Sequence, residues 1–466
     1  MEDRLSTPRA WQAYLEEHRQ EHLDQLFEFL RIPSVSSLPE HKDDIQRAAE
    51  WVARQLRDAG VPKVEIMPTA GNPVVYGEWI VDESKPTALI YGHYDVQPPD
   101  PVEQWETPPF EPAIRGDRIY ARGAADDKGN LFMPIKAVEA LSRTDGQPPI
   151  NLKFSIEGEE EIGSPNLPPF VEENVDLLAC DFVLCADGGM WGPDTPSLTL
   201  GSKGITGCQV NVRTADTDMH SGGFGASIQN AVRAAAQLAA TLHDEQNRVA
   251  VEGFYDDVVP ITDEERELFS QAPFDEQEYL QSVGATEIVG EHGYSAVELN
   301  WGRPTLDLNG FWGGFTGPGT KTVTPCEAHF KITCRLVPNQ DPEKILKLLE
   351  AHLQKHAPAG ATVTVDASTT GGSRAFRVGP EHPAIQAAYE VLGDLYDRDP
   401  YYVRLGGTLP IAATYQEVLG ADMIFFSWGM PDSRAHAPNE NFQLRSFDMA
   451  RRAYCALFDR LATQSD

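Results

Sequence analysis

Three short apolar segments, each followed at once by acidic or imidazole side chains, most constrain the fold of this chain. They are residues 87–91 (TALIY), 151–156 (NLKFSI) and 182–186 (FVLCA). Apolar runs of this length are typical of strands that are buried on both faces of a parallel sheet. Strands that alternate with helices predict an α/β domain with a mostly parallel sheet and helices on both of its faces.

Helical spacing of apolar residues predicts long helices in the first and last parts of the chain. These helices cover residues 9–31, 45–59, 130–143, 383–396 and 446–462. Between Lys203 and about Glu381 the pattern changes to alternating strands and Ala-rich or amphipathic helices. The elements expected there are 206–212, 226–245, 327–337, 342–356 and 362–365.

The length of the chain and the change of pattern together predict two domains. The 466 residues exceed what one hydrophobic core usually supports. We therefore expect an α/β catalytic domain formed by residues 1–203 and 381–466. An α+β lid or dimerisation domain, residues 204–380, is expected to be inserted into it.

The charge of the chain argues against two classes of partner. Lys and Arg number 38 against 71 Asp and Glu, so the formal net charge is −33. This excess of negative charge disfavours binding to nucleic-acid phosphates and to anionic lipid. No segment reaches the roughly 18 consecutive apolar residues of a membrane span. We expect no nucleic-acid partner and no membrane partner.

Cysteine usage and the N-terminal sequence bear on location. The six cysteines include no C-x-x-C pair, and the first residues are polar and charged rather than basic and then apolar. Reduced thiols in a cytoplasmic protein are the simplest interpretation. Cys326 and Cys334 lie too far apart on a predicted strand to bond each other, so we expect them to be core residues.

His93 and Asp95 follow the first apolar segment. On extended backbone, residues two apart point to the same face. A carboxylate beside an imidazole can accept its free N–H and leave the other ring nitrogen for a metal. An H-x-D pair by itself is a weak signal, and a polar loop at the end of a strand is the simpler interpretation of it.

Two acidic loops and two single residues complete the candidate site. Asp126 and Asp127 stand in a Gly-flanked loop, where they could also simply begin a helix. Residues 157–161 hold four carboxylates that repel one another unless solvated or neutralised by cations. Asp187 follows the third apolar segment, and His436 lies in a late loop. Sites in open α/β sheets gather at the carboxyl ends of strands, which favours a site over scattered polar loops.

A further match, H-x-x-E-H at residues 18–22, is discounted. It resembles a zinc-protease helix motif, but it lies on a strongly charged predicted helix. We interpret it as a solvated helix face.

The six motifs together resemble the M20 metallopeptidase family, which contains the carnosine-type dipeptidases. They are YGHYDVQP (91–98), RGAADDKG (122–129), EGEEEIGS (157–164), CADGG (185–189), GGTLP (406–410) and SRAHAPNE (433–440). The resemblance covers almost the whole chain in order. Each fragment alone is unspecific, whereas the combination is highly specific.

The resemblance implies a centre of two divalent metal ions. Asp126 would bridge the ions, His93 and Asp187 would complete the ligands of one, and Glu161 and His436 those of the other. It also implies a cis peptide bond after Asp126. Charge balance agrees, because three ligand carboxylates and a bridging hydroxide neutralise four positive charges. Imidazole with carboxylate suits Zn²⁺, Mn²⁺ or Co²⁺ without choosing among them.

The resemblance also implies roles for residues outside the ligand set. Glu160 matches the general acid/base and Asp95 the residue that orients the His93 ring. In the inserted domain, His220 resembles a histidine that reaches the partner subunit's site and stabilises the oxyanion. Arg335 resembles the arginine that grips the substrate carboxylate. The remaining substrate contacts would be Thr322, Gly406, Gly407 and Thr408.

These implications predict a homodimeric metallopeptidase that cleaves dipeptides or very short peptides with a metal-bridging water and Glu160 as base. In this family, Asp at position 187 tends to accompany dipeptidases and aminopeptidases. Two alternatives stay open. One is an N-acyl-amino-acid deacylase of the same fold, and the other is a non-catalytic metal-binding relative.

Overall fold

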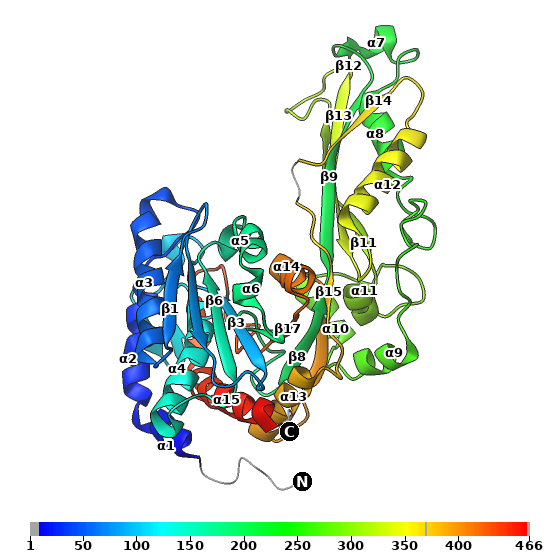
Figure 1. Cartoon of the computed structure of the whole chain (residues 1–466). Coiled ribbons are helices and arrows are strands. Elements are labelled where there is room, and N and C mark those ends of the chain that lie inside the picture. Colours follow the sequence, from blue (N-terminus) through cyan, green and yellow to red (C-terminus); the bar gives the residue numbers. More distant parts are fainter. Residues whose placement is uncertain (1–8, 369–370, 464–466) are drawn as a thin grey trace. The chain divides into compact units, whose positions relative to one another are not determined.

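The computed structural model describes residues 9–368 and 371–463. The chain forms two compact units (Figure 1). The first, unit 1, comprises Met1–Leu200, Val378–Tyr402 and Thr414–Asp466. The second, unit 2, comprises Gly201–Arg377 and Val403–Ala413. Residues 403–413, which we expected in the catalytic domain, thus cluster with the inserted segment.

Unit 1 is built on a mixed six-stranded sheet. The strands are β1 (Lys63–Met67), β2 (Val74–Trp79), β6 (Asn151–Glu157), β3 (Thr87–His93), β7 (Phe182–Cys185) and β17 (Asp422–Phe425), in that spatial order. β6, β3, β7 and β17 are parallel to one another, whereas β2 pairs antiparallel with β6 and β1 antiparallel with β2. The three apolar segments of the sequence therefore form adjacent parallel strands, β6, β3 and β7, in the middle of the sheet.

Helices cover both faces of this sheet, as predicted (Figure 1). The helices of unit 1 are α1 (Ala10–Glu17), α2 (Arg19–Leu30), α3 (Lys42–Asp58), α4 (Lys128–Asp145), α5 (Leu167–Glu173), α6 (Val175–Leu178), α13 (Pro383–Tyr396) and α15 (Leu444–Thr463), with the second part of α14 (Pro410–Leu419). On one face, α3 packs on β1 and β2, and α4 on β3. On the other, Tyr415 packs edge-on against Tyr91 and donates to the hydroxyl of Ser155.

Two details of the N-terminal helices differ from the sequence prediction. The single helix expected over residues 9–31 is broken at His18 into α1 and α2. The interpretation of residues 18–22 as a solvated face is wrong for His22, whose side chain is fully buried. The ring is buried because α2 packs on α4, and Glu139 of α4 and Arg451 of α15 lie next to it.

A small sheet in unit 1 joins distant parts of the chain. It comprises β18 (Asn441–Gln443), β5 (Arg118–Tyr120) and β4 (Ala113–Arg115), in that order. β18 pairs antiparallel with β5, so that Asn441 faces Tyr120. This pairing brings the loop after β5 beside the loop before β18.

Unit 2 contains an antiparallel four-stranded sheet of order β11-β13-β9-β14. Its strands are β11 (Thr305–Gly313), β13 (Glu327–Leu336), β9 (Gly204–Arg213) and β14 (Thr362–Asp366). Helices α8 (Ala231–Ala239) and α12 (Pro342–Lys355) pack on it and share its apolar core. The helix expected over residues 226–245 is thus shorter, because Asn230 caps its start and Asp244 accepts two backbone N–H groups in a turn.

The other elements of unit 2 are short. They are β10 (Met219–His220), α7 (Ser221–Phe224), α9 (Asp263–Ser270), α10 (Glu276–Val283), α11 (Ala296–Gly302), β12 (Val323–Thr324) and β15 (Phe376–Arg377). β8 (Ser197–Ser202) and β16 (Tyr401–Leu405) begin in unit 1 and end in unit 2. The predicted fold class, an α/β domain with an inserted α+β domain, is confirmed.

Two expectations about the whole chain concern membranes and thiols. Among the described helices, none has the length and apolar character needed to cross a membrane. All six cysteines lie in the described residues and are free thiols. Cys334 is a buried core residue, as expected, whereas Cys326 is partly exposed.

Candidate metal centre

Five side chains proposed as metal ligands meet at one edge of the sheet of unit 1. His93 is the last residue of β3, and Asp187 lies two residues beyond β7. Glu161 stands in a short 3₁₀ turn, Glu160–Ile162, after β6. Because these strands are parallel neighbours, their carboxyl ends share this edge. The loops after β5 and before β18 add Asp126 and His436.

Asp126 lies between the two imidazole rings. Its Oδ1 is 3.1 Å from His93 Nε2, and its Oδ2 is 2.8 Å from His436 Nε2. Each ring also faces one further carboxylate. Asp187 Oδ2 is 3.9 Å from His93 Nε2, and Glu161 Oε2 is 3.1 Å from His436 Nε2. One carboxylate therefore offers an oxygen to each of two imidazole–carboxylate pairs, as a bridging ligand does.

The residues present fit a metal ion. One ligand atom each from His93, Asp126 and Glu161 lies within 4.8 Å of the others. Glu161 Oε1 is buried and has no hydrogen-bond partner among the described residues, although its Oε2 accepts from Gln97 at 2.9 Å. A buried carboxylate oxygen without a partner is unfavourable unless a cation binds it.

The electrostatics of the cluster also favour cations. Burial opposes ionisation of Asp126, but hydrogen bonds from His436 and His93 outweigh it and lower the pKa of this carboxyl well below its usual range. The hydrogen bonds that His436 makes to Asp126 and Glu161 raise the pKa of its ring to about 10. Burial raises the pKa of Asp187 to about 6. Without a metal ion the cluster therefore holds protons on its ligands, and a divalent cation would displace them.

The four carboxylates of residues 157–161 have different surroundings. Glu157 accepts from Tyr91 and Ser164, and Glu159 from Asn72 and Asn166, so both hold the local structure together. Glu161 faces His436.

Glu160 differs from these three carboxylates in its side-chain contacts, although burial also raises the pKa of Glu157 to about 8. The Glu160 side chain has no hydrogen bond to the described part of the chain. Burial raises the pKa of Glu160 to about 8, and the carboxylates of Asp187 and Glu161 add to this rise. A carboxyl group with a raised pKa is suited to accept and return a proton near neutral pH.

Asp95 connects His93 with the acidic turn. The His93 Nδ1 atom lies 3.1 Å from the backbone carbonyl of Asp95 and 3.4 Å from its Oδ1. The Asp95 carboxylate also accepts the backbone N–H groups of Glu160 and Glu161, at 3.3 and 3.2 Å. It is therefore placed to fix both the imidazole ring and the turn that carries the predicted base.

Unit 2 holds the other predicted site residues in two groups. His220 ends β10, is exposed, and its Nδ1 accepts from Gly222. Thr322 lies beside it, because its carbonyl accepts from Ser221 at 3.0 Å. In the second group, Arg335 donates to the Thr408 hydroxyl at 2.7 Å. The adjoining residues Gly406 and Gly407 belong to the same loop of unit 2.

The two groups lie at opposite ends of the sheet of unit 2. Arg335 faces Ile205 at the start of β9, whereas the Cys326–Glu327 segment next to β12 lies beside Arg213 at its end. β9 has 10 residues, so the two ends are roughly 30 Å apart. One small substrate molecule cannot contact both groups of a single chain.

The sequence matches peptidase family M20/M25/M40 over residues 89–460. The chain belongs to this family. The resemblance inferred from the six motifs is confirmed, and with it the prediction of a metallopeptidase.

Relatives of this M20 chain span nearly all of it. It is 28% identical to "Beta-Ala-His dipeptidase" of Homo sapiens, over 96% of this chain and 92% of the relative. It is also 28% identical to "Cys-Gly metallodipeptidase dug1" of Schizosaccharomyces pombe, over 97% and 98%. Among solved structures, the "M20 family metallo-carboxypeptidase Sso-CP2 from Sulfolobus solfataricus" superposes with a TM-score of 0.81 at 34% identity, covering 95% of this chain and 99% of that one.

Sequence reasoning assigned no role to two buried carboxylates, Asp127 and Glu440, which lie beside the proposed metal ligands. Asp127 accepts the backbone N–H of His93 at 3.1 Å, and the bond between Asp126 and Asp127 is cis, as the resemblance predicted. Glu440 accepts from the loop that carries Asp126. Both residues stand inside quoted motifs, but their partners lie far away in sequence.

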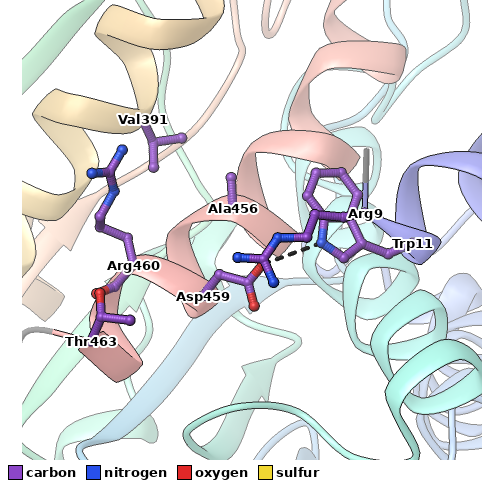
Figure 2. A pocket seen from close by; sticks show the side chains of 7 residues that line it. All are labelled: Arg9, Trp11, Val391, Ala456, Asp459, Arg460 and Thr463. Atoms are coloured by element: carbon purple, nitrogen blue, oxygen red, sulfur yellow. Dashed lines mark hydrogen bonds between the residues drawn. The ribbon is translucent and has the colours of Figure 1, made fainter. Parts of the chain in front are cut away.

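A separate pocket of unit 1 lies away from this edge (Figure 2). It is lined by Arg9, Trp11, Val391, Ala456, Asp459, Arg460 and Thr463. The Asp459 carboxylate accepts from the Trp11 indole N–H at 3.3 Å. Because its one carboxylate already has a donor and no His or Cys lines it, this pocket offers no comparable chemistry.

Proposed function

We propose that this metallopeptidase hydrolyses dipeptides or very short peptides and binds two divalent metal ions. The observation that carries the proposal is the position of Asp126 between His93 and His436. His93 and Asp187 would hold one ion and Glu161 and His436 the other, with Asp126 shared. Zn²⁺, Mn²⁺ and Co²⁺ all suit this ligand set.

Ions bound there would lower the pKa of a water molecule and polarise the scissile carbonyl group. Glu160 would take a proton from the attacking water and return it to the leaving amine. The raised pKa of Glu160 supports this role, because a group that titrates near neutral pH can serve in both directions. Asp95 would keep the His93 ring and the Glu160 turn in place.

Unit 2 would supply the contacts to the substrate. Arg335 is suited to bind the terminal carboxylate of a peptide in bidentate geometry. Thr408, Gly406 and Gly407 would form the wall beside that carboxylate. If Arg335 binds the terminal carboxylate close to the scissile bond, only very short peptides fit, which would explain a preference for them.

His220 and Thr322 would act on the substrate of the partner subunit in a homodimer. The separation of roughly 30 Å along β9 supports this arrangement, because Arg335 and His220 of one chain cannot reach the same dipeptide. His220 would then stabilise the negative charge that develops on the carbonyl oxygen. Unit 2 would serve as both lid and dimerisation domain.

The surface of unit 2 supports dimerisation. β11 is an edge strand, and it exposes the apolar side chains of Leu308, Phe311 and Trp312. Ala236 of α8 and Ala240 directly after the helix are exposed, and such small residues allow close approach of another chain. Long exposed apolar edge strands of this kind are usually covered by a partner. Location in the cytoplasm stays a prediction from the cysteine usage and the N-terminal sequence.

A second candidate activity is the removal of C-terminal residues from longer peptides. It is favoured by the similarity to the metallo-carboxypeptidase structure at 34% identity. The Arg335 guanidinium would then bind the C-terminal carboxylate of a longer peptide. The dipeptidase names of the relatives that span the chain favour the first proposal.

A substrate panel separates these activities. Metal-loaded protein would be given dipeptides, C-terminally amidated dipeptides, hexapeptides and N-acyl amino acids, with free amino acids measured. The proposal predicts rapid cleavage of dipeptides and strong discrimination against the amidated forms. Faster trimming of hexapeptides would indicate a carboxypeptidase, and faster release from N-acyl amino acids a deacylase. No turnover of any substrate by protein with bound metal would contradict the proposal.

A further inference from the structure

The loop that carries Asp126 is held by a single buried carboxylate. Glu440 is fully buried, and its Oε1 accepts the backbone N–H groups of Ala125 and Asp126 at 2.9 and 3.1 Å. Its Oε2 accepts from Gly123 N–H at 3.0 Å and from Arg122 Nη1 at 2.7 Å. Gly123 has a φ of 82°, a conformation that is strained for residues with a side chain, and in this turn the N–H groups of residues 123, 125 and 126 all point to the Glu440 carboxylate.

Glu440 also belongs to the loop that carries His436. It lies four residues beyond His436 and directly precedes β18, which pairs with β5. The His436 loop needs such an anchor, because Arg434, His436 and Asn439 all have positive φ values between 59° and 63°. Non-glycine residues in this conformation persist where surrounding contacts hold them.

We infer that Glu440 is a positioning residue that fixes the distance between Asp126 and His436. These two side chains come from loops more than 300 residues apart. Glu440 joins the loops through four hydrogen bonds, three from backbone N–H groups and one from the Arg122 guanidinium. His93 and Asp187 stand at strand ends and do not depend on this link. Loss of Glu440 should therefore weaken the binding of the ion shared by Asp126 and His436 more than that of the other ion.

The inference rests on the proposed metal centre and adds a residue to it. A glutamine at position 440 has the same shape, but its amide nitrogen accepts no hydrogen bond. Four donors converge on Glu440, two on each oxygen. Either orientation of the glutamine would leave two of them facing an N–H₂ group. Glu440→Gln therefore disturbs the loop with little change in volume.

Glu139→Gln is the matched control. Glu139 is another buried carboxylate of unit 1 that accepts from a buried cation, Lys136, at 2.6 Å. It makes no contact with a proposed metal ligand. Both substitutions should lower the thermal midpoint, so a change in metal affinity that only Glu440→Gln shows would reflect positioning rather than general stability.

The experiment is calorimetric titration of the metal-stripped full chain with Zn²⁺ or Mn²⁺ alone, together with steady-state kinetics on a dipeptide. For Glu440→Gln we expect one of the two binding steps to weaken about 10- to 100-fold, with a lower kcat and little change in KM. Glu139→Gln should bind both ions as the wild type does. Wild-type affinity for both ions in Glu440→Gln would overturn the inference.

A second variant keeps the test decisive if Glu440→Gln does not fold. Arg122→Met removes the guanidinium, and with it the hydrogen bonds to Glu440 and to the carbonyl of Pro98. A smaller weakening of the same binding step is expected, and unchanged affinity would overturn the inference. Absence of metal binding by the wild-type chain would be a different result, because it would overturn the proposed metal centre itself.

Discussion

Two buried clusters of charged side chains in unit 1 differ in how their charges are matched. In the first, between α2, α4 and α15, Glu139 accepts from Lys136 and from the Tyr14 hydroxyl, and Arg451 donates to His22. In the second, at the sheet edge, several carboxylates face only two imidazole rings. No Lys or Arg side chain donates to the proposed metal ligands in the described part of the chain.

The difference separates the structural role of the first cluster from the catalytic role proposed for the second. A buried carboxylate that already has a cationic partner stabilises the packing of its helices, and removal of that partner is strongly destabilising. Buried carboxylates without cationic side chains require another source of positive charge, which protons or metal ions provide. Burial and charge alone would not distinguish the clusters, whereas the identity of their partners does.

The largest expected effect comes from the residue shared by both proposed ions. Asp126→Asn should remove bound metal and reduce dipeptide hydrolysis to the uncatalysed background, because both metal positions lose a charged ligand. Metal content and turnover after incubation with Zn²⁺ or Mn²⁺ would be measured. Asp432→Asn serves as the control, because the Asp432 side chain is 62% exposed. This variant should retain the metal content and the turnover of the wild type. Full activity in Asp126→Asn would contradict the assignment.

Glu160 should affect the chemistry without affecting the metal. Glu160→Gln is expected to lower kcat by about 10²- to 10⁴-fold, the usual contribution of general acid–base catalysis. Metal content measured by elemental analysis should stay at the wild-type value. If the variant loses its metal together with its activity, Glu160 is a ligand and the separation of roles proposed for residues 160 and 161 is wrong.

The matched cluster should respond in stability rather than in activity. Lys136→Met leaves Glu139 buried without its cation, which should lower the free energy of unfolding by about 3–5 kcal/mol. Denaturant unfolding of the metal-stripped protein measures this change. The double variant Lys136→Met/Glu139→Leu removes both charges and should recover most of the loss. A double variant as unstable as the single one would show that packing, not charge, dominates there.

His22 should give the matched cluster a modest dependence on pH. Burial lowers the pKa of His22, and its Nδ1 accepts from Arg451, so the folded ring stays neutral. The unfolded chain takes up a proton below about pH 6.5 that the folded chain does not, and stability therefore falls as the pH falls below this value. One such proton changes the unfolding free energy by at most about 1.4 kcal/mol per pH unit.

His22→Gln provides the comparison for this pH dependence. Glutamine can accept from Arg451 without titrating. The difference in unfolding free energy between wild type and variant, measured from pH 7.5 to 5.0, should shrink or change sign as the pH falls. A difference that stays constant with pH would mean that His22 does not titrate differently in the folded and unfolded chain.

The sequence predicted those parts of the fold that local patterns determine. Residues 383–396 form α13 with the predicted bounds, and the three apolar segments form β3, β6 and β7. The spacing of apolar residues predicted a helix over 226–245 that is longer than the observed α8. This spacing carries no information on turns such as the one in which Asp244 accepts two backbone N–H groups. The helices between residues 263 and 302 are only seven or eight residues long, too short for a hydrophobic period to stand out, and were not predicted.

For the site, the proposed ligands followed from motifs at strand ends, but their supports did not. The partners of Glu440 lie at residues 122–126, and a distance of more than 300 residues leaves no local pattern. Nor does the sequence distinguish Glu157 and Glu159, which hold neighbouring segments, from Glu160, whose side chain is left free to react. These differences arise only when the loops are brought together by the pairing of β5 with β18 and of β3 with β6.

Titration of the metal-stripped wild-type chain with Zn²⁺ or Mn²⁺ tests the central claim most directly, with bound metal and dipeptide hydrolysis recorded at each step. The account predicts two bound ions per chain and hydrolysis that is absent without metal and returns as the ions bind. Undiminished hydrolysis by the stripped protein, or saturation of activity without any bound metal, would contradict it.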